Sequence, residues 1–375
     1  MKITGGNVFD PDAGFVERDV CLEGALISAD NGDGRVFDAS GCYVIPGLTD
    51  LHFHGCKGED FSDGDPDGLA VMAEYELSRG VTQICPAGMT LPEEQLYRIC
   101  RTAAAYRGAE KPKRKPGAEL VGVNLEGPFL SEAKKGAQNG AWLHAPDAEL
   151  LRGLRKASEG LVKLVSVAPE LPGALEFVRE VSGEAVVSLA HTAADYDTAL
   201  KALELGAREI THLFNAMPPF SHRAPGVVGA ALDSPGCRVE LICDGVHIHP
   251  AVVRAVFRLF GPERVILISD SIRGAGMPDG QYTLGGQDVT VRGALATLAD
   301  GTIAGSVTDL MGCVRKAVSF GIPLADAVRA ATLNPAEAIG VSDRFGTLDT
   351  GKRANIAILD QELALKAVFF DGQEV

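Results

Sequence analysis

The sequence lacks an excess of positive charge and any apolar run near the roughly 20 residues of a membrane-spanning helix. Its 375 residues hold 35 Lys and Arg against 50 Asp and Glu, and the formal net charge is −15. Nucleic acids and anionic membranes need a positive face, so we expect neither as a partner. The basic run at residues 110–117 is broken by proline and predicts a solvated loop. An anionic substrate would therefore need a local basic pocket.

The sequence also lacks any Cys-x-x-Cys pair, although it contains eight cysteines. Several of them fall inside apolar runs, which predicts buried, reduced thiols rather than disulfides and favours a cytoplasmic location. Met1 leads into a polar strand instead of a basic and then apolar leader, so we expect no secretion signal.

Eight apolar runs are present instead, and segments of helical periodicity separate them. This alternation predicts a parallel sheet, and eight strands predict closure into a (β/α)8 TIM-type barrel with its chemistry at the carboxyl ends of the strands. The runs span residues 44–55, 81–88, 120–129, 162–170, 185–192, 209–217, 239–247 and 265–272.

The two ends of the chain have a different pattern, in which short apolar pieces alternate with turn signals. Both ends are therefore expected to form one small β-sandwich domain. The predicted division is residues 1–43 and 341–375 for this domain and residues 44–340 for a metal-dependent barrel.

Ligand and proton-transfer side chains gather at the predicted strand exits, whereas chance would scatter them over the helices and both ends of the strands. They are His52, His54, Glu126, His191, His212, His247 and Asp270.

The first two of these lie two residues apart, which puts both imidazoles on one side of a strand and suits one metal. A pair of this kind also occurs on surfaces and in cores. Glu126 lies inside an apolar run and needs a partner there, because an unpaired buried carboxylate is costly. A metal or a structural salt bridge would each supply one.

Two loops next to the strand exits predict a substrate pocket. The loop at residues 214–229 carries Asn215, His222 and Arg223 among glycines and prolines, which suits a phosphate or carboxylate. A surface acid paired with the arginine is the alternative. The Gly-rich segment after Asp270 is long enough to form a further wall of the pocket.

Six longer motifs are more specific and together resemble the N-acetylglucosamine-6-phosphate deacetylase family of the amidohydrolase superfamily. The resemblance covers nearly the whole chain. Its motifs are LEGPFLSEAKKGAQN, LAHTAADYDTA, THLFNAMPPFSHRAPG, CDGVHIHP, ISDSI and TIAGS.

The resemblance implies roles for individual residues. In the family, a glutamate and two histidines that match Glu126, His191 and His212 bind a divalent metal, and the catalytic aspartate matches Asp270. The substrate contacts of the family match Ala137, Gln138, Asn215, Ala216, Arg223, His247, Ile303, Ala304 and Gly305.

The resemblance further implies Zn, Fe or Mn as the metal, with one or two ions per subunit. Some members replace the first histidine pair with non-ligands and hold one metal, whereas His52 and His54 are both present here. Many members have a histidine where this chain has Gln138. Many are also homodimers in which the arginine matching Arg223 reaches the substrate phosphate of the neighbouring subunit.

The expected reaction is hydrolysis of the acetamide of N-acetylglucosamine 6-phosphate in amino-sugar catabolism. Asp270 would take a proton from the attacking water and return it to the amine, and His247 would help to stabilise the tetrahedral intermediate. A deacetylase of N-acetylgalactosamine 6-phosphate, another amidohydrolase and a non-catalytic scaffold are the alternatives. Cyclic amide hydrolases typically use a carboxylated lysine, and here Lys163 lies at a strand entrance.

Overall fold

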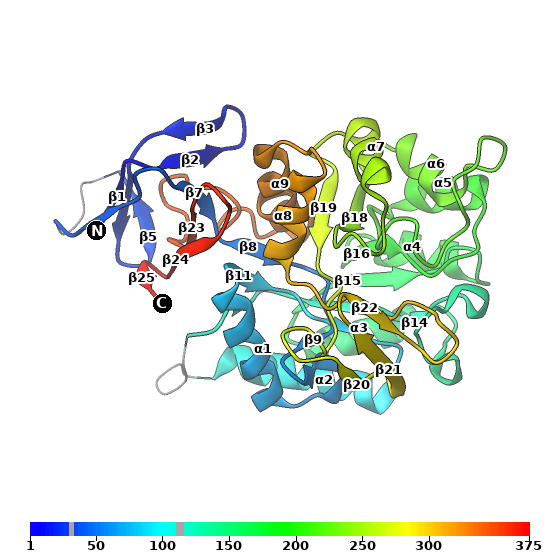
Figure 1. The fold of residues 1–375 in the computed structure, drawn as a ribbon. Coiled ribbons are helices and arrows are strands. Elements are labelled where there is room, and N and C mark those ends of the chain that lie inside the picture. Colours follow the sequence, from blue (N-terminus) through cyan, green and yellow to red (C-terminus); the bar gives the residue numbers. More distant parts are fainter. Residues whose placement is uncertain (30–33, 110–115) are drawn as a thin grey trace.

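A computed structural model describes residues 1–29, 34–109 and 116–375 (Figure 1). Most of the run expected as a solvated loop, residues 110–115, lies outside the described part. No helix among the described residues is both long and apolar enough to cross a membrane. All eight cysteines are free, and all except Cys21 and Cys42 are buried, as expected for reduced thiols.

Parallel strands form the barrel in the middle of the chain. They pair in the orders β8-β11-β13 and β12-β14-β15-β16-β17-β18-β19. The first and last strands meet beyond their exits, where the Asp270 amide donates to the His52 carbonyl over 2.9 Å. The predicted TIM-type barrel is confirmed. Its strands are β8 (Leu48–Asp50), β11 (Val81–Ile84), β12 (Ala87–Gly88), β13 (Glu119–Leu120), β14 (Val123–Phe129), β15 (Val162–Val167), β16 (Val186–Leu189), β17 (Glu209–Ile210), β18 (Arg238–Ile242) and β19 (Val265–Ile268).

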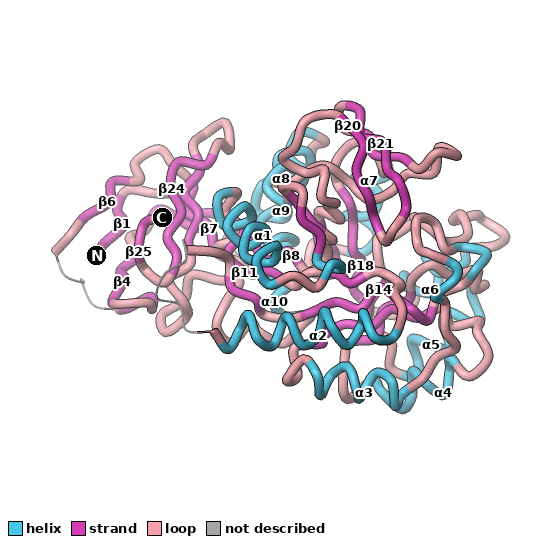
Figure 2. Tube along the Cα trace, turned by 90° about the horizontal axis from the view of Figure 1, so that it is seen from below, coloured by secondary structure: helices cyan, strands magenta, loops and turns pink. Residues whose placement is uncertain are grey.

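Helices cover the outside of the barrel (Figures 1 and 2). The strands read as continuous apolar runs because both of their faces are covered, as in β19, where every residue is buried. The α-helices are α1 (Pro66–Ser78), α2 (Glu93–Gly108), α3 (Ala148–Ala157), α4 (Ala174–Val181), α5 (Tyr196–Leu205), α6 (Gly226–Leu232), α7 (Pro250–Phe260), α8 (Leu310–Ser319), α9 (Leu324–Ala331) and α10 (Leu333–Ala338). Most of the α-helices bury one face and expose the other, whereas α6 is buried at all but its last residue.

Strands from both ends of the chain form two further sheets, ordered β5-β4-β1-β6 and β25-β24-β23-β7-β2-β3. The blue and red strands lie side by side in Figure 1. The two sheets share one apolar core that includes Ile3, Val20 and Phe369, which gives the expected β-sandwich. The strands are β1 (Lys2–Thr4), β2 (Asn7–Asp10), β3 (Gly14–Glu17), β4 (Val20–Glu23), β5 (Leu26–Ser28), β6 (Val36–Asp38), β7 (Tyr43–Pro46), β23 (Ile356–Leu359), β24 (Leu365–Phe370) and β25 (Gln373–Glu374).

The first apolar run is divided between the two parts of the molecule at Gly47. The strand before it, β7, pairs with β2 and β23 of the terminal sheet, and the strand after it, β8, pairs with β11 of the barrel. A Cβ at Gly47 would lie 1.9 Å from the Thr82 hydroxyl oxygen, so only glycine fits this crossing. The expected boundary at residue 44 falls inside β7. The division into domains stays a prediction.

Short elements frame the mouth of the barrel. The Gly-rich segment after the last strand folds into an antiparallel sheet that packs with Met89 and Ile272 in a small apolar cluster. The sheet consists of β20 (Gly280–Leu284), β21 (Gln287–Arg292) and β22 (Leu295–Thr297). The other short elements are the hairpin β9 (Gly55–Cys56) and β10 (Glu59–Asp60), and the 3-10 helices η1 (Phe61–Asp63), η2 (Glu132–Lys134) and η3 (Gly140–Trp142).

Candidate active site

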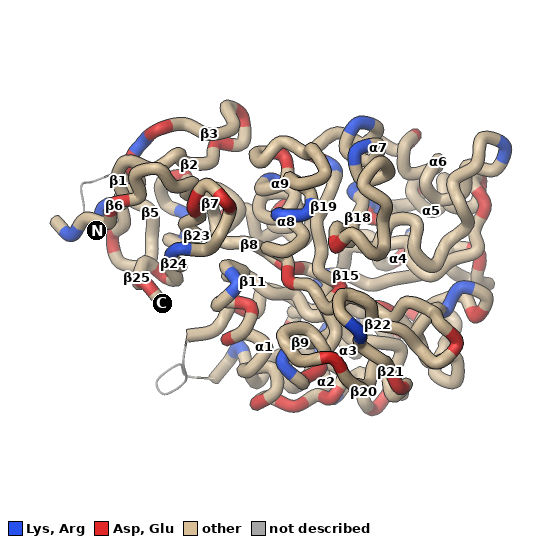
Figure 3. Tube along the Cα trace, viewed as in Figure 1, with Lys and Arg blue, Asp and Glu red and all other residues tan. Residues whose placement is uncertain are grey.

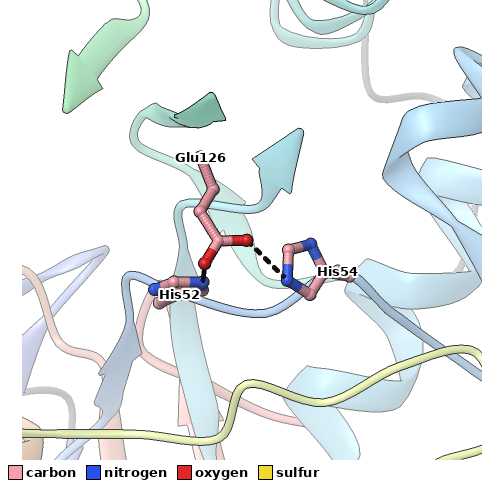
Figure 4. A group of neighbouring side chains, drawn as sticks. All are labelled: His52, His54 and Glu126. Carbon is pink, nitrogen blue, oxygen red and sulfur yellow. Dashed lines mark ion pairs between the residues drawn. The ribbon is translucent and has the colours of Figure 1, made fainter. Parts of the chain in front are cut away.

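Histidines and carboxylates converge at the carboxyl ends of the barrel strands. His52 and His54 follow β8, and Figure 4 shows both imidazoles turned toward the Glu126 carboxylate. Glu126 itself lies in β14, whose residues are all buried. Both imidazoles face the same carboxylate, in agreement with the two-residue spacing.

Three further site residues leave their strands with left-handed backbone angles. The φ values of His191, His212 and Asp270 are 44°, 28° and 48°. Residues other than glycine rarely adopt this conformation, which costs of order 1–3 kcal/mol and concentrates at active sites. The backbone therefore turns sharply at each of these three strand exits, and all three side chains lie in the same cluster.

Glu126 is the centre of this cluster. Its Oε1 lies 3.0 Å from His191 Nε2 and 2.8 Å from His212 Nε2, and its Oε2 lies 3.2 Å from His54 Nε2. Burial raises the pKa of Glu126, but the neighbouring histidines, beginning with His52, more than offset this and hold the pKa well below its ordinary value. The carboxylate is therefore ionised although it is 2% exposed.

Asp270 faces the same histidines from the last strand. Its Oδ1 lies 3.3 Å from His54 Nε2 and 3.7 Å from His52 Nε2. Burial raises the pKa of Asp270, yet the contact with His54 and the charge of His52 outweigh it and keep the pKa below its ordinary value. An ionised, largely buried carboxylate can accept a proton from water placed between it and the histidines.

The cluster has the donors and the spacing of a metal site. The two trios His52, His54, Glu126 and Glu126, His191, His212 each hold three buried ligand atoms within 4.8 Å of one another. The two imidazole nitrogens Nε2 of His191 and His212 lie 3.2 Å apart. Tetrahedral ligand atoms about 2.1 Å from a zinc ion are separated by about 3.4 Å, so this spacing fits a shared ion.

An orphaned atom supports the same conclusion at the first pair. His52 Nε2 is fully buried and has no hydrogen-bond partner among the described residues. Its other ring nitrogen, Nδ1, lies 2.8 Å from Glu240 Oε2, which fixes the imidazole so that Nε2 faces Glu126 and Asp270. A buried polar atom without a partner is costly, and a divalent ion would satisfy it.

Glu240 connects the two trios through one carboxylate. Besides its contact with His52, its Oε2 accepts a hydrogen bond from the His212 backbone amide over 3.1 Å. Metal-binding histidines usually donate their second ring nitrogen to a group of this kind, which fixes the ring and its tautomer. Burial, followed by the charge of Glu240, raises the pKa of the adjacent Glu209 well above its ordinary value, so Glu209 retains its proton.

The loop after β14 closes over the cluster and returns to it. Gln138 Nε2 donates to Glu126 Oε2 over 2.7 Å, and Gln138 Oε1 accepts from the Thr90 amide over 2.8 Å. A glutamine here can thus hold the central carboxylate on the side away from His191 and His212. This contact places one of the expected substrate residues directly against an expected metal ligand.

A cavity of about 310 Å³ opens above the cluster. All sequence-predicted site residues line it except His52, Ala304 and Arg223. His52 lies beneath the cavity floor at 0% exposure, Ala304 is buried in the small cluster behind the cavity wall, and Arg223 is exposed outside the lining. The lining includes His54, Glu126, Ala137, Gln138, His191, His212, Asn215, Ala216, His247, Asp270, Ile303 and Gly305.

Two of these lining positions are fixed by close contacts. His247 Nδ1 lies 2.7 Å from Asp244 Oδ2, and Asp244 Oδ1 accepts from the Val246 and His247 amides. The second ring nitrogen of His247 has no hydrogen-bond partner among the described residues and can meet a ligand. A Cβ at Gly305 would lie 2.8 Å from the Asp270 backbone carbonyl oxygen, so this segment can pack against the Asp270 main chain only as glycine.

Two other histidines lie away from the site. His144 is exposed, and His249 caps α7 by accepting from the Ala251 amide. Sequence patterns missed Glu240, Asp244 and the cavity residue Lys134. The acid inside the apolar run 239–247 was the available signal for Glu240, because a buried carboxylate needs a partner.

Comparisons with known proteins decide the family. Residues 43–375 match the profile of the Amidohydrolase family. The chain belongs to the amidohydrolase family. Its members are typically metal-dependent hydrolases, in agreement with the two ligand trios.

Relatives of this amidohydrolase carry more specific names. An N-acetylglucosamine-6-phosphate deacetylase from Bacillus subtilis is 37% identical over 85% of this chain and 81% of its own length. An N-acetylgalactosamine-6-phosphate deacetylase from Escherichia coli O157:H7 is 36% identical over 88% of this chain and 87% of its own length. The solved N-acetyl-D-glucosamine-6-phosphate deacetylase of Mycobacterium smegmatis, an aspartate variant with N-acetyl-D-glucosamine-6-phosphate bound, superposes with a TM-score of 0.92 at 32% identity, over 100% of this chain and 98% of that one.

The two trios predict that metal content depends on the first histidine pair. Protein purified without chelator should contain more than one equivalent of divalent metal, and the double variant His52→Ala, His54→Ala should fall toward one, because Glu126, His191 and His212 remain. Elemental analysis measures this stoichiometry.

A double variant of His144→Ala and His222→Ala, which removes two exposed imidazoles, serves as the matched control and should keep the wild-type content. One equivalent in both the wild type and the His52, His54 variant would remove this pair from the metal ligands.

Proposed function

We propose that this amidohydrolase cleaves the acetamide of N-acetyl-D-glucosamine 6-phosphate and releases D-glucosamine 6-phosphate and acetate, as a step of amino-sugar catabolism. The observation that carries the proposal is the buried Glu126, His191 and His212 trio facing Asp270 at the mouth of a barrel. The names of the relatives supply the substrate, since they act on 6-phosphorylated N-acetyl amino sugars.

The proposal gives the metal-binding role to Glu126, His191 and His212, with His52 and His54 as a second set, and the two ligand trios support it. A bound divalent ion lowers the pKa of water toward about 7 and polarises a carbonyl group. Zn, Fe and Mn all accept this mixture of nitrogen and oxygen ligands, and we propose one of them, with one or two ions per subunit.

Asp270 performs the proton transfers in this proposal. Its lowered pKa leaves it ionised and ready to accept the proton of the attacking water. After the carbonyl carbon becomes tetrahedral, the same carboxyl group returns the proton to the amine nitrogen, so that the C–N bond breaks with a neutral leaving group. The nearby His54, whose Nε2 lies 3.3 Å from Asp270 Oδ1, can orient this carboxyl group and stabilise its ionised form before the first transfer and after the second.

The cavity walls hold the sugar and its phosphate. His247, fixed by Asp244, donates from its free ring nitrogen to the developing oxyanion or to the phosphate. The expected substrate contacts at Ala137, Gln138, Ile303 and Gly305 surround the same space, whereas the buried Ala304 acts through its backbone at most.

We also propose a cytoplasmic homodimer. Arg223 is exposed outside the cavity of its own subunit, a position from which it can reach the phosphate in a neighbouring subunit. The free cysteines favour a reducing compartment.

N-acetylgalactosamine 6-phosphate is the second candidate substrate, because a relative of nearly equal identity bears the corresponding name. Steady-state acetate release from both 6-phosphorylated sugars and from their unphosphorylated forms separates the candidates. The proposal expects the highest kcat/KM on N-acetylglucosamine 6-phosphate. A preference for the galactose epimer, or equal rates with and without phosphate, would overturn the substrate assignment.

Arg223→Ala should raise the KM for the phosphorylated sugar about tenfold and change the KM for the unphosphorylated sugar much less, since a charged hydrogen bond contributes roughly 1.5–3 kcal/mol. The exposed Arg258→Ala is the matched control and should leave both constants unchanged. If the arginine acts across the dimer, mixing Arg223→Ala subunits with Asp270→Asn subunits should restore some activity. Equal losses on both sugars would instead indicate a folding or interface role.

A further inference from the structure

The cavity contains one cationic side chain that the known features of the site leave without a role. Lys134 is the only lysine or arginine among the described residues that line the cavity. Two carboxylates, Glu126 and Asp270, lie in the same lining, and the whole chain has a formal net charge of −15. Figure 3 shows acidic and basic positions interspersed along the described trace. The overall charge of the protein therefore repels an anionic substrate, and only cations near the cavity can attract one.

The backbone of Lys134 is held against the metal-binding cluster. His191 Nδ1 lies 2.9 Å from the Lys134 carbonyl oxygen, and the Lys134 amide donates to the Ser131 carbonyl over 3.0 Å. The Ser131 amide in turn donates to the His191 carbonyl over 3.0 Å. The stem of the lysine therefore starts from a fixed point beside a metal ligand, while its four carbons allow the ammonium to move within the cavity.

The same strand exit supports the segment in which phosphate contacts are expected. The Thr192 amide, next to His191, donates to the Ala216 carbonyl over 3.0 Å. Asn215, Ala216 and Lys134 all line the cavity. Lys134 and the Asn215–Ala216 segment thus approach the cavity from one shared support.

The neighbouring lysine has a different environment. Lys135 Nζ lies 3.3 Å from Glu132 Oε1, and Lys135 is absent from the described cavity lining. Lys134 has no ion pair within the described ranges 1–29, 34–109 and 116–375. A half-buried lysine on the cavity wall that has no ion pair among the described residues is available for an anionic ligand.

We propose that Lys134 binds the phosphate group of the substrate from within the same subunit. This inference rests on the proposed function and identifies a second cation for the phosphate, beside the exposed Arg223. A phosphate dianion has several acceptor oxygens, so the ammonium of Lys134 and the guanidinium of Arg223 from a neighbouring subunit can bind it together.

Calorimetric titration with glucosamine 6-phosphate and with glucosamine tests Lys134 without catalysis. Lys134→Met should weaken binding of the phosphorylated sugar about ten- to a hundredfold, and the ratio of the two affinities should fall by a similar factor. Lys134→Arg should retain most of this ratio because it keeps the charge. Lys135→Met is the matched control, which removes the adjacent ammonium and should leave the ratio unchanged. Metal content and Tm are compared in all variants.

Kinetics separate this inference from the proposed function. If the wild-type protein were inactive on every N-acetyl sugar, the proposed deacetylation would be contradicted, while the titrations would still report on Lys134. Equal weakening of glucosamine and glucosamine 6-phosphate by Lys134→Met would overturn the phosphate role, because a contact with the sugar ring, which both ligands share, affects them alike. The inference is also overturned if the wild type binds the phosphorylated sugar no more tightly than the plain one.

Discussion

Asp270→Asn should lower kcat by roughly a hundredfold or more, the usual contribution of a general acid and base, while the fold and the bound metal are retained. The amide is nearly isosteric with the carboxylate but cannot accept the proton of the attacking water at neutral pH. The position of residue 270 does not depend on the charge of its side chain, because its backbone amide donates to the His52 carbonyl and its backbone carbonyl accepts from the Ser306 amide. Turnover and metal content are measured on the same preparation.

The matched control is Asp288→Asn, which removes an exposed carboxylate from β21 and should leave kcat unchanged. Near-normal turnover of a fully metallated Asp270→Asn protein would contradict the assignment of Asp270 as general acid and base. Lost metal in this variant would instead make Asp270 a ligand, as its 3.3 Å approach to His54 allows.

Glu126→Gln should lower activity more than Asp270→Asn does. The carboxylate is within 3.0 Å of His191 Nε2 and His212 Nε2 and belongs to both ligand trios, so its neutralisation impairs both potential ion positions. A Lewis acid contributes several kcal/mol to transition-state stabilisation, so we expect kcat/KM to fall about a thousandfold or more. Metal content should fall well below one equivalent, as elemental analysis will measure.

Glu132→Gln, in the loop that follows β14, is the control for the loss of one carboxylate and should retain metal and activity. A Glu126→Gln protein that keeps its metal and its rate would reduce Glu126 to a structural ion-pair partner of the histidines. Circular dichroism and Tm distinguish loss of metal from loss of fold.

The barrel could be predicted because its physical signal is local. A strand covered on both faces must be apolar throughout, as β19 is, and an amphipathic helix between strands must cover the sheet. The crossing at Gly47 was not predictable in the same way. Residues 44–55 form one apolar run whether or not the chain changes sheets, and the change depends on the contact with Thr82, which is distant in sequence.

The candidate metal ligands could be predicted from their positions at strand exits, since the carboxyl ends of parallel strands meet at one face of a barrel. The groups that orient them could not. Glu240 acts on His52 across 188 residues of sequence, and Lys134 lines the cavity because a loop folds back onto His191. Such contacts depend on the closed barrel rather than on any local pattern.

Release of acetate and of a primary amine from N-acetylglucosamine 6-phosphate, followed before and after chelation, tests the central claim most directly. The account predicts equal amounts of the two products, loss of the reaction when the metal is removed, and recovery when Zn, Fe or Mn is returned. Metallated protein that releases no acetate, or stripped protein that keeps its full rate, would contradict it.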